Sequence, residues 1–194
     1  MKIIVSPDSF KGSCSAIEVA DSIEKAIYDV DSTVNVVKMP VADGGEGTID
    51  AITSCVPADI YELEVCDPMG EQALATYAII ENGETAIIEM AQASGLPMVP
   101  VEERNPLVAT TYGTGQLMKD ALDKGVKKMI IGIGGSATND GGAGMLMALG
   151  ASFRNVASIV LKRIENIITA KESHLIIKFI QFSPIKVFFK ITNH

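Results

Sequence analysis

A chain of 194 residues is long enough for one domain, or for a small pair of domains, with a hydrophobic core. Its formal net charge of −8 argues against non-specific binding to nucleic acid or to an anionic membrane surface. No apolar run reaches the roughly 18 residues of a spanning helix, and Met1 and Lys2 run straight into a strand pattern rather than a signal peptide. The three cysteines match no metal spacing and are expected to be reduced thiols in a cytoplasmic protein.

Strand and helix signals alternate from the amino terminus onward. Residues 2–6 predict a strand that ends in a polar turn, and residues 34–37 predict a second strand. Between them, Ser15 and Glu18 form a capping-box pattern at the start of an amphipathic helix. A polar loop over residues 40–47 and a short helix follow the second strand. This alternation predicts an α/β fold.

The middle of the chain interrupts the alternation. Residues 61–66, 74–80 and 85–90 all have strand character. The last two of these segments are joined across Asn82-Gly83, which is a type I′ hairpin signal. The sequence therefore predicts an antiparallel β excursion within the α/β fold, rather than a simple repeated βαβ array.

A glycine-rich segment follows a predicted helix over residues 113–124 and a predicted buried strand over residues 127–131. It reads IGIGGSATNDGGAG from residue 131 to residue 144, and residues 145–149 are good helix formers. A strand, a glycine-rich turn and a helix in this order place free backbone N–H groups at a helix N-terminus, where an anion such as phosphate binds. The segment lacks the lysine of a Walker A loop and the second glycine of a nucleophile elbow.

Two further polar loops follow predicted strands and carry charged side chains. Asp8 and Lys11 lie in the first and fit the binding of phosphate or a small acid at the carboxyl end of a strand. Asp43 and Glu46 flank paired glycines in the second and fit Mg²⁺ binding through oxygen ligands. The residues alone leave a solvated turn as the alternative for the first loop. For the second, the alternative is a turn with Glu46 in the first turn of a helix.

Five motifs together identify a family that the chain resembles. They are SPDSFKGS at residues 6–13, VADGGEGT at 41–48, ASGLP at 93–97, TTYGTG at 110–115 and IGGSATNDGGAG at 133–144. Over residues 1 to about 153 the chain resembles the bacterial glycerate kinase family, in which these motifs occur in the same order. The resemblance implies two α/β domains with the active site between them, and phosphorylation of glycerate with ATP and Mg²⁺.

Phosphoryl transfer asks the protein mainly for positioning and charge neutralisation. Because no histidine precedes His174, the base for the substrate hydroxyl is expected to be a carboxylate, and the candidates are Asp8, Asp43 and Asp140. Lys11 is expected to pair with the glycerate carboxylate or with a phosphate. The residues expected to bind ATP are Gly113, Gly115, Gly134, Gly135, Ser136, Thr138 and Asn139, and those expected to bind Mg²⁺ are Asp43 and Glu46.

The composition changes near Phe153. All 17 glycines lie at or before Gly150, whereas residues 154–194 contain nine isoleucines and carry a net charge of +5, against −13 for residues 1–153. The second half of family members has no counterpart in this sequence. We therefore expect residues 1–153 to be the N-terminal portion of a family member, truncated or frameshifted, and residues 154–194 to be a divergent tail. A genuine Ile/Lys-rich domain end is the alternative.

An incomplete two-domain architecture affects the expected function. The alternative to an active glycerate kinase is a non-catalytic remnant that at most binds phosphate or nucleotide. Apolar faces left open by absent segments favour self-association. Within the tail, residues 159–168 have helical spacing, and residues 175–182 and 187–191 have strand character. The tail is not expected to pack against the first part, so its deletion is expected to leave the stability of residues 1–153 unchanged.

Overall fold

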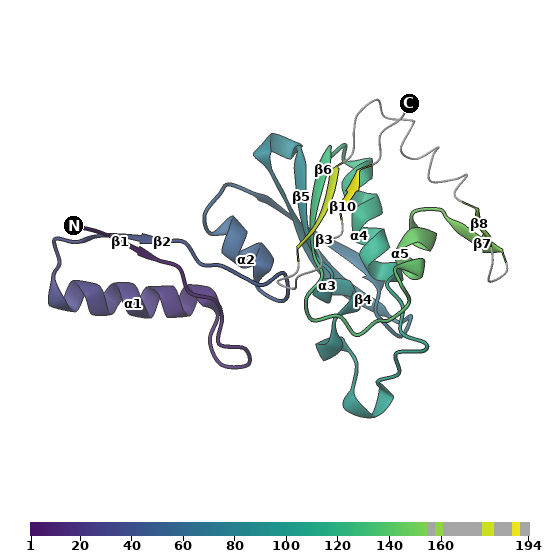
Figure 1. The fold of residues 1–194 in the computed structure, drawn as a ribbon, viewed down its shortest axis with the longest axis horizontal. Coiled ribbons are helices and arrows are strands. Elements are labelled where there is room, and N and C mark those ends of the chain that lie inside the picture. Colours follow the sequence, from purple (N-terminus) through teal and green to yellow (C-terminus); the bar gives the residue numbers. More distant parts are fainter. Residues whose placement is uncertain (155–157, 161–175, 181–187, 191–194) are drawn as a thin grey trace.

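A mixed six-stranded β-sheet forms the body of the molecule, with strand order β10-β9-β6-β5-β4-β3 (Figure 1). The computed structural model describes residues 1–154, 158–160, 176–180 and 188–190. The strands of the large sheet are β3 (Asp59–Cys66), β4 (Gln72–Ile80), β5 (Thr85–Glu89), β6 (Lys128–Gly132), β9 (Ile176–Ile180) and β10 (Phe188–Lys190). With the helices described below, the architecture is of the α/β class that the sequence predicts.

The predicted antiparallel excursion is present. Strand β3 pairs antiparallel with β4, and β4 pairs antiparallel with β5. Asn82 and Gly83 both have positive φ, of 55° and 94°, as a type I′ turn requires. The connection is longer than a two-residue hairpin, however, because Ile80 pairs with Thr85 and leaves residues 81–84 outside the ladder. Glu81 also takes a positive φ of 54°.

The other half of the sheet is parallel. Strands β5 and β6 run parallel, and the chain crosses between them through α3 (Ala91–Ser94), two short 3₁₀ turns (Leu96–Met98 and Val101–Glu103) and α4 (Tyr112–Asp123). Helix α4 ends where Gly125 adopts a φ of +91°, a conformation that other residues rarely take. Parallel pairing brings the carboxyl ends of β5 and β6 to the same edge of the sheet.

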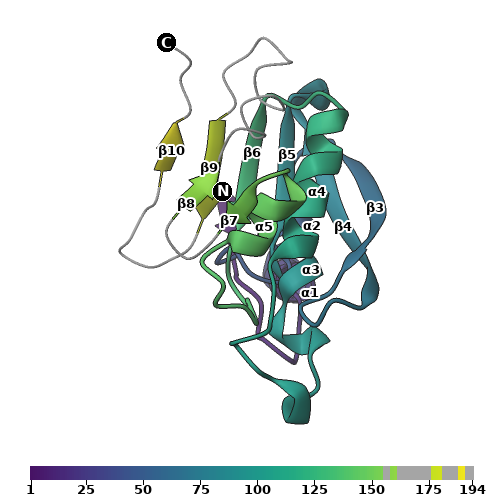
Figure 2. The same ribbon diagram turned by 90° about the vertical axis from the view of Figure 1, so that its right-hand side faces the viewer.

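Helices cover both faces of the sheet. Helices α4 and α5 (Ala143–Ala148) lie over one face (Figure 2), where the largest hydrophobic core forms. This core includes Tyr77, Ile88, Leu117, Met118, Met129 and Ile131. The helix α2 (Thr48–Thr53) covers the other face, where Ile49 packs with Ala78 and Ile87. Ala86, Ile87 and Ile88 alternate between the two cores, which explains why the middle of β5 is apolar at three successive positions.

The N-terminal residues form a separate βαβ unit beside the large sheet (Figure 1). Strand β1 (Lys2–Val5) pairs in parallel with β2 (Asn35–Lys38), and α1 (Ala16–Val30) connects them. The predicted capping box is confirmed, because the Ser15 hydroxyl accepts the Glu18 N–H and the Glu18 carboxylate accepts the Ser15 N–H. The loops that leave β1 and β2 both turn toward the large sheet.

The described parts of the tail are strands. Strand β7 (Ser152–Arg154) pairs antiparallel with β8 (Ser158–Val160), while β9 pairs in parallel with β6. The expectation that the tail does not pack against residues 1–153 is therefore wrong at β9, because β6 lies within those residues. The strand character predicted for residues 175–182 and 187–191 is therefore confirmed at β9 and β10. The helix predicted over residues 159–168 begins inside β8, and the rest of it lies outside the described residues. Among the described helices, none combines the length and the apolar character needed to cross a bilayer.

Candidate active site

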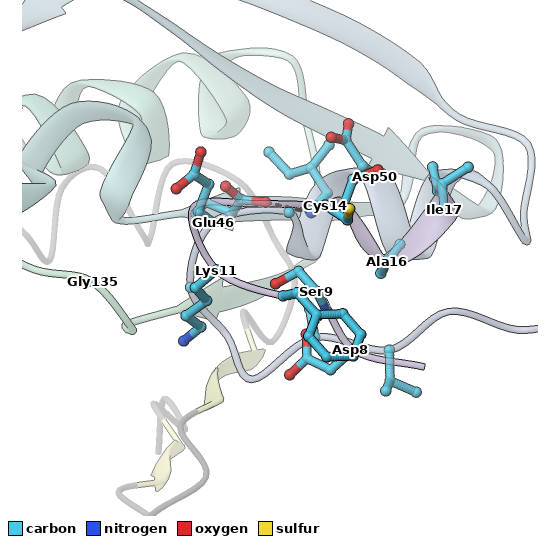
Figure 3. Close-up of a pocket in the computed structure, with 18 of the residues that line it drawn as sticks. Asp8, Ser9, Lys11, Cys14, Ala16, Ile17, Glu46, Asp50 and Gly135 are labelled. Atoms are coloured by element: carbon cyan, nitrogen blue, oxygen red, sulfur yellow. Dashed lines mark hydrogen bonds between the residues drawn. The ribbon is translucent and has the colours of Figure 1, made fainter. Parts of the chain in front are cut away.

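A cavity of about 450 Å³ lies where the N-terminal unit faces the large sheet (Figure 3). Its walls come from the loops after β1 and β2, from α2, and from the carboxyl ends of β5 and β6. The sequence-predicted residues Asp8, Lys11, Glu46 and Gly135 all line it. The structure thus brings together loops that are far apart in the chain, at the strand ends where α/β proteins bind ligands.

Lys11 and Asp43 join the two N-terminal loops. The Lys11 ammonium donates to Asp43 Oδ2 over 2.5 Å, and the Gly45 N–H donates to Asp43 Oδ1 over 3.0 Å. The hydrogen bond from Lys11 lowers the pKa of Asp43, and the same bond raises the pKa of Lys11. Asp8 and Glu46 add attraction that raises the pKa of Lys11 further. The Lys11 ammonium therefore interacts with three carboxylates, and it lines the cavity together with Asp8 and Glu46.

The glycines of the 131–144 segment accommodate another loop of the same chain. The Gly134 N–H donates to the Gly44 carbonyl over 2.9 Å. A Cβ added at Gly134 would lie 2.7 Å from the Gly45 nitrogen, closer than a side chain is found in proteins. On the other side, the Leu96 N–H donates to the Gly135 carbonyl over 2.8 Å. The glycine-rich loop is thus held between residues 44–45 and residues 94–96.

At the helix N-terminus after this loop, the N–H groups expected to face an anion have a partner within the chain. The Asp140 carboxylate accepts the N–H groups of Gly142 and Gly144 over 2.9 and 3.0 Å. It also accepts the Thr111 N–H over 2.9 Å, and the Thr111 hydroxyl in turn accepts the Met145 N–H. Burial raises the pKa of Asp140, but these hydrogen bonds outweigh it and hold the pKa below its ordinary value. The chain's own carboxylate fills the place that was expected to hold phosphate.

The other residues expected to bind ATP are not among those that line the cavity. Gly113 and Gly115 are buried in α4, where an added Cβ would clash with the backbone at Cys66 and at Met145. Ser136 and Thr138 hydrogen-bond to each other through their hydroxyls over 2.8 Å, and Asn139 is exposed. Packing explains the two helical glycines, and the assignment of all five residues to ATP stays a prediction.

The cavity floor contains a polar group of residues that the sequence reasoning missed. Glu89, Gln92 and Thr76 all line the cavity. The Glu89 residue is 1% exposed although its side chain is a carboxylate. One feature of the sequence could have indicated Glu89: it is the last residue of a largely apolar strand, at the edge where the carboxyl ends of the parallel strands lie. That signal was overlooked because a charge at a strand end also fits a solvent-facing residue.

The carboxylates near Lys11 fit a magnesium ion held jointly with phosphate. In the part of the chain that the structure describes, no three His, Cys, Asp or Glu side chains gather into a complete metal site. Proteins commonly hold Mg²⁺ through one or two carboxylates, with the remaining positions taken by phosphate oxygens and water. Asp43 and Glu46 are such a pair of oxygen donors, on one loop beside the cavity.

Fold and cavity together define an α/β protein whose ligand site lies at the carboxyl ends of its parallel strands. The family model for the glycerate kinase family matches residues 3–178. The chain therefore belongs to the glycerate kinase family. The match continues past residue 153, where the change in composition suggested a boundary.

Several relatives share this similarity. The chain is 54% identical over 150 residues to a glycerate kinase of Bacillus subtilis, covering 77% of this chain and 39% of that protein. It is 52% identical over 151 residues to a glycerate 2-kinase of Escherichia coli, covering 78% of this chain and 40% of that protein. It also resembles a crystal structure from Salmonella typhimurium LT2, provisionally named glycerate kinase 2. That match has a TM-score of 0.79 and 43% identity over 91% of this chain and 51% of the other. The chain thus spans about two fifths of the length of these curated relatives.

Proposed function

We propose that the chain carries the N-terminal part of a kinase site that phosphorylates glycerate with ATP and Mg²⁺. The observation that supports this most directly is the meeting of Asp8, Lys11, Glu46 and Gly135 at one cavity. These residues belong to three of the motifs that resemble the glycerate kinase family, and they are widely separated in sequence. A site for an anionic substrate needs such a cation beside hydrogen-bonding groups.

Lys11 is the proposed binding group for the glycerate carboxylate or for a transferred phosphate. Its ammonium group is exposed enough to exchange Asp43 for a ligand anion, since its side chain is 69% exposed. Asp8 and Asp43 are the proposed acceptors of the substrate hydroxyl proton, because both lie beside Lys11. Asp140 is a weaker candidate for that proton than the sequence suggested, since its oxygens are already held by Thr111, Gly142 and Gly144.

Asp43 and Glu46 would hold the magnesium ion. The lowered pKa of Asp43 makes this carboxylate a weaker base, so of the two roles proposed for it, that of metal ligand is the better fit. When bound, the ion supplies charge neutralisation for the phosphoryl group. The main contribution of the chain itself is to place the carboxylates, Lys11 and the substrate in one geometry.

A non-catalytic module that binds an anion is the second candidate. It is supported by the share of the relatives that the chain spans, which is 39% and 40% for the two described above. Exposed apolar side chains such as Val30, Ile60 and Leu74 support the proposal that this chain self-associates. Three free cysteines support a reducing compartment, so we propose a cytoplasmic location.

The test is ATP consumption that depends on D-glycerate, with purified chain and Mg²⁺. The kinase proposal predicts a rate that is proportional to the chain concentration and that falls sharply in Lys11→Ala. Asp59→Asn, a change at an exposed aspartate at the start of β3, serves as the control and should keep the wild-type rate. Phosphate or nucleotide binding without any glycerate-dependent turnover would support the second candidate instead.

A further inference from the structure

Glu89 is a buried carboxylate for which the proposed chemistry has no role. It ends β5, on the floor of the cavity, and it is 1% exposed. A charged group at such a place is costly unless hydrogen bonds compensate it. The partners that it has therefore indicate what it does.

The first partner is the backbone at the start of α2, directly after the loop that follows β2. Glu89 Oε1 accepts the Ile49 N–H over 2.5 Å. The Gly47 N–H also favours the ionised form of Glu89 and lowers its pKa, although burial is stronger and leaves the pKa raised. Glu89 thus holds the backbone that immediately follows Glu46 and Gly47.

The second partner orients the carboxylate. Gln92 donates its side-chain N–H to Glu89 Oε2 over 3.3 Å, and the Thr76 hydroxyl donates to Gln92 Oε1 over 3.2 Å. These bonds connect β4, α3 and β5 in one chain of polar contacts. Because Gln92 donates to Oε2 of Glu89, the other oxygen, Oε1, faces the Ile49 N–H. The network therefore fixes the position at which the backbone of Ile49 is held.

Hydrogen bonds within residues 43–48 connect the segment held by Glu89 to Asp43. The Thr48 hydroxyl donates to the Gly45 carbonyl over 2.7 Å, and the Gly45 N–H donates to Asp43 Oδ1 over 3.0 Å. The loop is also fixed from outside at Gly44, whose carbonyl accepts the Gly134 N–H. Residues 43–49 therefore have two anchors, one at the end of β6 and one at Glu89.

We propose that Glu89 is a positioning residue, which holds residues 43–49 so that Glu46 lines the cavity and Asp43 meets Lys11. The role in phosphoryl transfer rests on the proposed function, whereas the role in holding the loop does not. Glu89 acts through the Ile49 N–H and needs no contact with substrate.

Hydrogen exchange measured by mass spectrometry on the full 194-residue chain tests the loop. The variants are Glu89→Leu, which keeps the volume but has no hydrogen-bond acceptor, and Glu89→Gln. The amide oxygen of the latter accepts the Ile49 N–H when the Gln92 amide turns its oxygen toward the new NH2 group. Loss of a hydrogen bond to a charged group predicts exchange about tenfold faster, or more, over residues 43–54 in Glu89→Leu. Exchange in β4 and β6 should stay at the wild-type rate. Glu89→Gln should recover most of the protection.

The control is Glu64→Gln, which removes a carboxylate from an exposed position of β3 and should change neither region. Unchanged exchange over residues 43–54 in Glu89→Leu would overturn the proposal. An equal rise of the exchange rate in every strand would also overturn it, because such a rise indicates a general loss of stability. If Glu89→Leu does not fold, Gln92→Leu takes its place. It should raise exchange in the same segment, and a wild-type pattern there would refute the orienting network.

The activity measurement separates the two proposals. In a chain with glycerate-dependent turnover, Glu89→Leu should lower kcat by about 10²-fold, because the loop misplaces its carboxylates. Glu89→Gln should retain most of kcat. A wild-type chain without turnover would count against the kinase proposal, while the exchange result would still decide whether Glu89 holds the loop.

Discussion

Lys11 Nζ lies 2.5 Å from Asp43 Oδ2, although 32 residues separate the two in sequence. The pair connects the loop after β1 with the loop after β2, next to the cavity. Both side chains are substantially exposed, at 69% and 36%, and exposed ion pairs contribute little to folding. The pair is therefore better explained by what it offers a ligand than by what it adds to stability.

Lys11→Ala is expected to separate function from stability. The free energy of unfolding should fall by less than about 1 kcal/mol, because the ion pair is exposed. Binding of phosphate or glycerate should weaken markedly, since the cation of the site is lost. Urea titration and calorimetric titration measure the two quantities. Lys119→Ala breaks the exposed pair with Asp123, far from the cavity, and serves as the control. Equal ligand binding in wild type and Lys11→Ala would contradict the prediction.

Asp43→Asn is expected to lower turnover severely when residues 1–153 are joined to the second half of a relative. Removing a carboxylate that holds Mg²⁺ or accepts a proton costs about 10²-fold or more in rate. The asparagine can still accept the Gly45 N–H, so the fold should be kept. Steady-state kinetics and circular dichroism check both statements, with Asp59→Asn as the matched control. Near-normal turnover would show that Asp43 only shapes a turn.

Asp140→Ala is expected to destabilise the protein by about 1–3 kcal/mol, because buried N–H groups at α5 and Thr111 lose their acceptor. The pKa of Asp140 is lowered by folding, so the folded state binds fewer protons in acid than the unfolded state. Its contribution is complete above the ordinary aspartate value of about 3.9 and is lost as the pH falls from there toward the lower folded pKa. Urea titrations between pH 7 and pH 3 should show a smaller acid loss in the variant than in wild type. An identical pH dependence would refute this role.

Gly134→Ala is expected to cost about 1–3 kcal/mol, as overpacking does elsewhere. The added methyl would lie 2.7 and 2.8 Å from the nitrogen and Cα of Gly45, so one of the two loops must move. Thermal unfolding gives the cost, and Asn139→Ala in the same loop gives the control, because that side chain is exposed. Wild-type stability in Gly134→Ala would mean that the loops are not in contact in solution.

Local signals in the sequence predicted the elements well. The capping box at Ser15 and Glu18 and the positive φ at Asn82 depend on residues only a few positions apart, so the sequence contains the whole cause. Asp8 and Lys11 line one cavity with Gly135, although β1 and β6 belong to different sheets, and their role there stays a prediction.

Contacts between distant residues were not predictable in the same way. Asp140 was expected to face a ligand, and its partner Thr111 lies 29 residues away. The burial of Glu89 depends in the same way on Ile49, which is 40 residues distant and whose N–H it accepts. A glycine that leaves space for a ligand and a glycine that leaves space for another loop have the same sequence signature. Only the fold distinguishes them.

The contact between residues 44–45 and residues 132–134 has a consequence for sequence variation. A methyl group on Gly132 would meet the backbone at Gly44, and one on Gly134 would meet Gly45, so neither loop can change its shape independently of the other. In a library randomised at Gly132 and Gly134 together, selection for a folded chain should recover glycine at both positions far above chance. Insertions or deletions in one of these loops should survive only with compensating changes in the other.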